Sequence, residues 1–254
     1  MGLVGRPSSR PPCCWNVIVV NYFELMSNNI NLEELLAAGV HFGHQTRKWH
    51  PKMKPYIFGK REGFHIIDLV KTKEQLEEAI SLLQKCVNEE KAIVFVGTKR
   101  QAAAVVEAQA KKAGVSYITN RWIGGILTNF ESIQKTLLRL GNYEKRLSSA
   151  AFEKLSTRDK FKLKKEYARS QILVGGIANL EKRPDLLIIV DPGFEKSAVA
   201  EANTAGVPII ALMDTNSDPT KIEIPIPGND DALKSIEIIL GLLTEAIIEA
   251  KKLK

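Results

Sequence analysis

The segment HFGHQTRKWHPKMKPYIFGKR, residues 41–61, combines cations with aromatic rings and lacks any acidic residue. Its prolines exclude a continuous helix, so we expect an extended or looped arm. Cations on such an arm suit a phosphate backbone, and flat rings such as that of Trp49 suit bases or sugars. We call residues 41–61 the basic arm and predict that it binds nucleic acid; the alternative is a solvated loop with Trp49 packed in the core. Its cations are Arg47, Lys48, Lys52, Lys54, Lys60 and Arg61.

Three histidines of the basic arm, His41, His44 and His50, raise the question of a zinc site. Two of them have H-x-x-H spacing, which is a weak signal on its own. The three histidines need no metal to explain them, since their rings could pack in turns or donate hydrogen bonds to RNA. We predict no cofactor, although the sequence leaves open whether the histidines or Asp191 and Asp214 hold an ion.

Asp191, Asp214 and Asp218 follow predicted strands, at the edge where open α/β sheets bind ligands. Carboxylates there could hold a metal or perform acid–base catalysis. The segment DTNSDP that contains Asp214 is also rich in residues that form turns by bonding their own backbone. Neither G-x-G-x-x-G nor G-x-x-x-x-G-K-[ST] occurs. We therefore predict that the protein is not an enzyme; a nucleotide- or metal-dependent enzyme is the alternative.

Two further clusters follow predicted strands. The segment GTKR opens a helix, where Lys99 and Arg100 would face an RNA phosphate near free backbone amides. The segment RWIGGILTN places Arg121 and Trp122 beside two glycines, and these side chains can pair and stack with a nucleotide. A tight strand-to-helix connection, with Trp122 in the core, explains the second segment equally well.

Apolar segments of strand length alternate with amphipathic helices along most of the chain. Continuous apolar strands between helices indicate a parallel sheet that is covered on both faces. The pattern predicts a doubly wound α/β fold, with a last helix over about 231–252. The predicted strands are 65–69, 92–96, 115–118, 185–190 and 207–212.

Residues 128–183 break this alternation by placing two helices in succession. Capping signatures at Thr128 and Ser156 predict the two helix starts, as Thr72 does for the helix after the first strand. We expect a protruding antiparallel helical hairpin, a coiled-coil-like insertion into an α/β domain of residues 27–127 and 184–254. Residues 131–183 contain thirteen Lys or Arg and six Asp or Glu, which equals the formal charge of +7 of the whole chain.

The composition is ordinary for a soluble protein, with 44% hydrophobic and 26% charged residues. The positive charge favours a polyanionic partner, and no apolar segment approaches the roughly 18 residues of a membrane span. Cys13, Cys14 and Cys86 form neither a disulfide framework nor a metal quartet, which indicates a reducing compartment. Residues 1–26 are predicted to be a disordered extension, either upstream of a natural start at Met26 or part of an organelle-targeting sequence.

Over about residues 31–250 the chain resembles the S2 family of small-subunit ribosomal proteins, of the bacterial or organellar type. The resemblance implies a flavodoxin-like α/β domain with a helical hairpin and no catalytic role. His50 departs from the family pattern, in which we expect asparagine after the tryptophan, and the residues before Met26 lie outside that pattern. The matching segments are AGVHFGHQTRKWHPKMKP (38–55), FVGTKR (95–100), RWIGGILTN (121–129), DTNSDP (214–219) and IPGNDD (226–231).

The resemblance also implies a place in the ribosome of a bacterial cytoplasm, a plastid or a mitochondrion. There the protein would bind small-subunit rRNA near the junction of head and body. It would contact neighbouring proteins, dock ribosomal protein S1 where that protein exists, and so meet messenger RNA indirectly, without a membrane. A freestanding RNA-binding or scaffold protein is the alternative. The expected RNA-binding residues are Arg47, Lys48, Trp49, Lys52, Lys54, Lys60, Arg61, Lys99, Arg100, Arg121 and Trp122, with Lys160, Lys162, Lys164, Lys165 and Arg169 in the hairpin.

Overall fold

The computed structural model describes residues 30–149, 152 and 155–253. The predicted extension over residues 1–26, with Cys13, Cys14 and Met26, lies outside the described residues. The chain divides into Met1–Asn31, of which only the last two residues are described, and a compact unit over Leu32–Lys254.

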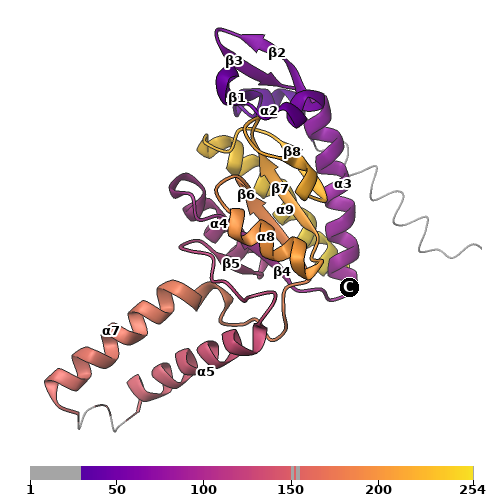
Figure 1. Cartoon of the computed structure of the whole chain (residues 1–254). Helices are drawn as coiled ribbons and strands as arrows, with labels where there is room; N and C mark the ends of the chain where they lie inside the picture. The colour runs from indigo at the N-terminus through magenta and orange to yellow at the C-terminus, as the bar shows by residue number, and fades with distance from the viewer. Residues whose placement is uncertain (1–29, 150–151, 153–154, 254) are drawn as a thin grey trace, which may run out of the picture. The chain divides into compact units, whose positions relative to one another are not determined.

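Five parallel strands form the central sheet of the compact unit, in the order β5-β4-β6-β7-β8 (Figure 1). This is the strand order of a flavodoxin-like sheet, so the predicted fold class is confirmed. Four of the strands match predicted ones. The fifth, β8, has no predicted counterpart, because Pro225 and Pro227 argue against a strand except at the edge of a sheet, where β8 lies. The bounds are β4 Ile93–Val96, β5 Ser116–Ile118, β6 Leu186–Val190, β7 Ile209–Met213 and β8 Ile224–Pro227.

Every residue of β4, β6, β7 and β8 is buried, because helices cover the sheet on both faces. Side chains such as Val94 and Leu187 share one core with the helix α8 (Lys196–Ala205). The opposite face is covered by α3 (Leu69–Asn88), α4 (Arg100–Ala113) and α9 (Leu233–Lys252), of which α9 contacts both α3 and α4 (Figure 1).

The basic arm consists of two short strands joined by an irregular segment. Its two ends are strands that pair with the predicted first strand in a small antiparallel sheet of order β1-β3-β2. The prediction of an extended or looped arm without a continuous helix is confirmed: both ends are extended strands whose backbone pairs with β3, and two short 3-10 segments lie between them. The elements are α2 (Leu32–Ala37), β1 (Phe42–Gln45), η1 (Thr46–Lys48), η2 (Pro51–Tyr56), β2 (Ile57–Arg61) and β3 (Phe64–Ile67).

Two helices, α5 (Phe130–Leu147) and α7 (Thr157–Val174), lie between β5 and β6 and contact one another. Ser156 caps α7 as predicted, since its Oγ accepts from the N–H of Asp159 at 3.2 Å. Thr128 does not cap α5, because its hydroxyl donates to Glu201 instead. Ile133 of α5 joins the core of the α/β sheet, and the division of residues 128–183 into a domain of their own stays a prediction.

The predicted capping box at Thr72 was wrong. The helix α3 begins earlier, at Leu69, and its cap is Asp68, which accepts from the N–H of Val70 at 3.0 Å. Thr72 is fully buried, and its Oγ1 donates to the carbonyl oxygen of Pro227 at 2.7 Å. This bond joins α3 to the edge strand β8.

We predict that Thr72→Val lowers the free energy of unfolding by about 1–3 kcal/mol, since valine keeps the shape but leaves the buried carbonyl of Pro227 without this donor. Urea unfolding followed by circular dichroism measures the loss. Thr204→Val is the control, because the exposed Thr204 hydroxyl bonds only within its own helix turn, to Ala200 at 2.9 Å. An equal loss in both variants would contradict the assignment.

Candidate nucleic-acid interface

The basic arm presents all six of its cations, Arg47 to Arg61, to solvent. Some are also oriented by neighbours. Arg47 Nε donates to Gln45 Oε1 at 3.0 Å. Lys52 Nζ lies 3.4 Å from Asp218 and donates to the hydroxyl of Thr220 at 3.0 Å, in the 3-10 segment η4 (Pro219–Lys221). Phosphates can therefore reach these cations without any rearrangement of the arm.

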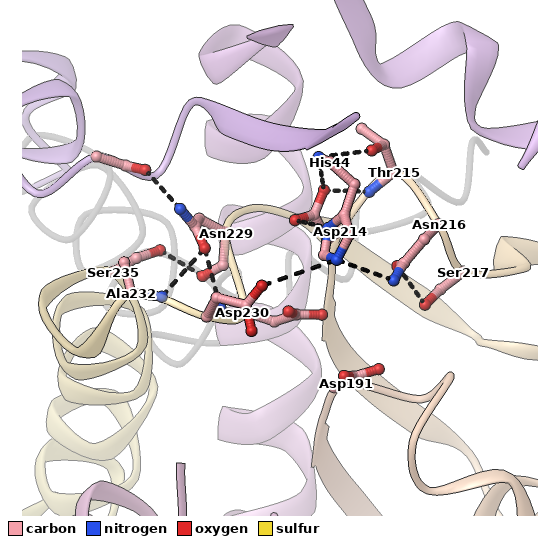
Figure 2. A network of polar contacts seen from close by, with 12 residues as sticks. His44, Asp191, Asp214, Thr215, Asn216, Ser217, Asn229, Asp230, Ala232 and Ser235 are labelled. Atoms are coloured by element: carbon pink, nitrogen blue, oxygen red, sulfur yellow. Dashed lines mark hydrogen bonds and ion pairs between the residues drawn. The ribbon is translucent and has the colours of Figure 1, made fainter. Parts of the chain in front are cut away.

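His44 attaches β1 to the carboxyl end of β7 (Figure 2). Its Nδ1 donates to Asp214 Oδ2 at 2.5 Å, and its backbone N–H lies 3.1 Å from both Asp214 Oδ1 and the hydroxyl of Thr215. The adjacent Gly43 permits this approach, because a Cβ there would lie 2.8 Å from Thr215 Cγ2. A second attachment comes from the N–H of His50, which donates to the carbonyl of Thr215 at 2.7 Å. The arm is thus tied to the β7 loop at two points.

The imidazole of His44 lies between carboxylates of two loops. The hydrogen bond to Asp214 raises the pKa of His44, burial opposes the shift, and the charges of Asp214, Asp230 and Asp231 add to it. Its Nε2 lies 3.7 Å from Asp231 Oδ2 and 3.3 Å from Asn216 Nδ2. The protonated ring is therefore the form that this site stabilises.

Lys99 lies in the same cluster. Its Nζ is 3.1 Å from Asp191, 2.7 Å from Asp230 and 2.7 Å from Asp231, and its side chain is only 14% exposed. Burial alone lowers the pKa of Lys99, but the hydrogen bonds and charges of these carboxylates outweigh burial and raise that pKa well above its usual value. Lys99 is thus bound to carboxylates of its own chain, while its neighbour Arg100 is exposed. Contact of Lys99 with RNA stays a prediction.

Asp230 is the most deeply buried member of this cluster (Figure 2). Its Oδ1 accepts from Lys99, whereas its Oδ2 has no hydrogen-bond partner. Burial, together with the charge of Asp191, raises the pKa of Asp230 to about 7. In the described part of the chain, no group of three or more His, Cys, Asp or Glu side chains is arranged to hold a metal ion. The strand-end aspartates instead form ion pairs and turns.

The segment 121–129 is held by Glu201 of α8. Glu201 Oε2 accepts from Trp122 Nε1 at 2.8 Å, and Oε1 accepts from three backbone N–H groups and from the hydroxyl of Thr128 at 2.8–3.1 Å. Burial raises the pKa of Glu201, but these hydrogen bonds outweigh it and leave that pKa below its usual range. Nothing in the sequence marks Glu201, since its role depends on a loop more than seventy residues away.

The predicted aromatic ligands are less accessible than the cations. Trp122 is 7% exposed and belongs to the core, as the structural interpretation of its segment expected, whereas Arg121 beside it is exposed. Trp49 is half-buried, with its ring centroid 5.3 Å from that of His65. Stacking of either tryptophan on RNA stays a prediction.

The five hairpin cations predicted to bind RNA all lie on α7. Lys162, Lys164, Lys165 and Arg169 are exposed around the buried Leu163, while Lys160 is half-buried. Lys160 and Lys164 place Nζ at 5.5 and 5.7 Å from the ring centroid of Phe152. The helix therefore offers phosphates a second cationic surface, separate in sequence from the arm.

We predict a pH effect of Asp230→Asn. The folded protein binds the Asp230 proton more tightly than the unfolded chain, so this group makes the free energy of unfolding fall as pH rises from about 4 to about 7. Asparagine does not titrate, so the stability of the variant relative to the wild type should rise across this interval, by on the order of 2 kcal/mol. Urea unfolding at several pH values measures the difference.

Asp218→Asn is the control for that experiment. Hydrogen bonds from Thr220, with help from Lys52, lower the pKa of Asp218 to about 2. Its contribution to stability is therefore present above about pH 4 and lost toward pH 2, outside the interval of Asp230. A constant difference between Asp230→Asn and wild type from pH 4 to 7 would contradict the assignment.

His44→Ala should lower the free energy of unfolding by about 1–3 kcal/mol near pH 6, because it removes a charged hydrogen bond to the buried Asp214. The raised pKa means that this contribution is fully present below the usual histidine pKa and is lost as pH rises through the raised one. His44→Asn, whose amide can donate to Asp214 without titrating, should recover part of the stability with no such pH dependence. A destabilisation by His44→Ala that grows with pH would sink this account.

Comparison with known proteins agrees with the motifs. A family model described as ribosomal protein S2 matches residues 35–250. The small ribosomal subunit protein uS2 of Dictyoglomus thermophilum is 47% identical over 226 residues, which cover 89% of this chain and 92% of that relative. The matched region contains the basic arm, the strand-end cluster, Glu201 and the hairpin. The resemblance is thereby confirmed, and the chain belongs to the ribosomal protein S2 family.

Proposed function

We propose that this protein is a structural component of the small ribosomal subunit and binds its rRNA through the basic arm and the cations of α7. Its place in the subunit is supported by the S2 family and by the relative that is itself a small-subunit protein. The family is one of ribosomal structural proteins, so the protein is not an enzyme. The observation that carries the RNA-binding proposal is an arm with six exposed cations and no acidic residue, anchored to a rigid sheet.

Rigid attachment of the arm to the sheet fixes the positions of its cations, which favours RNA binding. Phosphate contacts fix a protein's register on RNA but need their cations at defined positions. The arm meets this need because His44 and His50 bind it to the loop after β7, and Lys52 is held by the next turn. Folding therefore already orders the arm, so RNA binding does not carry the loss of conformational entropy that ordering a free loop would add.

We extend the proposal to neighbouring subunit proteins, including ribosomal protein S1 where it exists, and so to messenger RNA indirectly. The family relation supports this extension, and no residues are assigned to it.

None of the helices within the described ranges is long and apolar enough to cross a membrane.

Binding to small-subunit rRNA should weaken linearly with the logarithm of salt, by about 0.7–0.9 log units per phosphate neutralised. Arg47→Ala with Lys48→Ala should therefore make the slope shallower by about 1.4–1.8. Filter binding over a range of salt concentrations measures it. The exposed pair Lys112→Ala and Lys252→Ala, at the ends of α4 and α9, is the control and should leave the slope unchanged. An unaltered slope in the arm variant would remove these cations from the interface.

Sedimentation of a native lysate separates the ribosomal role from a freestanding one. We expect the protein to migrate with small subunits on a sucrose gradient at both low and high salt. A protein confined to the top of the gradient under both conditions would contradict the ribosomal proposal, whatever its affinity for isolated RNA.

A further inference from the structure

The small antiparallel sheet exposes three phenylalanines. Phe42 is 52% exposed, Phe64 is 44% exposed, and Phe58, at a β-bulge in β2, is 80% exposed. Each ring leaves apolar area in water that burial would stabilise. These rings are more exposed than Trp49 and Trp122, the two aromatic residues predicted to bind RNA. They are therefore the better candidates for an aromatic contact with a partner.

The strand register puts two of these rings on one face of the sheet. Side chains two apart on a strand point to the same side, so Phe64 and Ile66 of β3 share a face. Their cross-strand partners share it as well, because paired residues lie opposite one another. We call this surface the aromatic face; its two rows are Phe42–Ile66–Gly59 and Gln45–Phe64–Arg61.

The aromatic face is open and bordered by guanidinium groups. A Cβ added at Gly59 would meet nothing within 4 Å, so the end of the first row is unobstructed. In the second row, Phe64 lies between Arg61 on one side and Gln45 on the other, and Gln45 holds Arg47 at 3.0 Å. The adjacent residue of β3, Ile67, points the other way and is 1% exposed. One side of this sheet therefore faces the core, and the other offers rings with cations beside them.

We infer that the aromatic face stacks unpaired RNA bases while Arg47 and Arg61 bind the adjoining phosphates. This inference rests on the proposed RNA-binding function and names the kind of RNA that the arm takes. Single strands and loops expose the flat faces of their bases, which a regular duplex keeps stacked, and aromatic rings beside cations bind such bases with little regard to sequence. Charge complementarity favours RNA as the partner, since Arg47 and Arg61 border the rings, the basic arm contains no acidic residue, and an RNA strand supplies a phosphate beside every base.

The test uses the full-length chain and three RNA probes: a ten-residue oligoadenylate, an abasic strand with the same number of phosphates, and a duplex. Phe42→Leu with Phe64→Leu keeps the apolar character and removes both rings. We expect this variant to bind oligoadenylate about five- to thirtyfold more weakly, with an unchanged salt slope, because stacking releases no counterions. Its binding to the abasic strand and to the duplex should equal that of the wild type.

Two further variants complete the design. Phe42→Tyr with Phe64→Tyr keeps the rings and should retain wild-type affinity for oligoadenylate, which separates loss of stacking from a folding defect. Phe194→Leu removes a ring that is 61% exposed outside the arm and should have no effect.

Equal losses on oligoadenylate and the abasic strand, or no loss on either, would overturn the inference. If the leucine pair binds all probes normally but fails to enter small subunits, the aromatic face contacts a protein neighbour, which also overturns it. If the wild-type protein binds rRNA in a salt-dependent way but does not bind oligoadenylate, this inference is overturned and the proposed function is not. Salt-independent binding of rRNA would instead contradict the proposed function.

Discussion

Charge balance at the carboxyl edge of the five-stranded sheet is the constraint on which the rest of the molecule depends. The strands β6, β7 and β8 lead into Asp191, Asp214 and Asp230, all of them buried. Buried carboxylates are costly unless they are paired. Lys99, after β4, supplies one cation, and His44, from the basic arm, supplies the other. The position of the arm is thus set by the electrostatics of the sheet edge.

This arrangement also explains why a fold common among enzymes serves a structural role here. In open α/β sheets, ligands bind outside the carboxyl ends of the strands, where the strand order reverses. That place lies between β4 and β6, and it is occupied by the ion pair of Lys99 with Asp191. The groups that would hold a substrate are bound to one another. The proposed RNA contacts lie instead on the arm and on α7, outside this edge of the sheet.

The sequence predicted what depends on local pattern. Continuous apolar segments identified β4, β6 and β7, because a strand buried on both faces needs no polar residue. It missed β8, where prolines are tolerated only because the strand lies at the edge, and it misplaced the start of α3, where the hydroxyl of Thr72 binds a distant carbonyl. These outcomes depend on neighbours that only the fold supplies.

In the candidate site, too, the sequence predicted features that depend on local pattern and missed those that depend on distant residues. The density of cations in the sequence pointed to the arm, and all six of these cations are exposed, while their contact with RNA stays a prediction. No local pattern distinguishes Lys99, which is enclosed by three carboxylates, from Arg100, which is exposed. Likewise, the role of Glu201 and the placement of Phe42 and Phe64 on one face depend on pairing between strands and loops far apart in sequence. Long-range electrostatics and strand register decide such cases.

The central claim is that the basic arm lies against rRNA in the assembled subunit. Ultraviolet crosslinking of intact small subunits, followed by mass spectrometry of peptides that carry nucleotides, tests it most directly. We predict crosslinked nucleotides on peptides from residues 41–61, with further crosslinks on α7. Efficient crosslinking of this protein elsewhere, with none on the arm, would contradict the account.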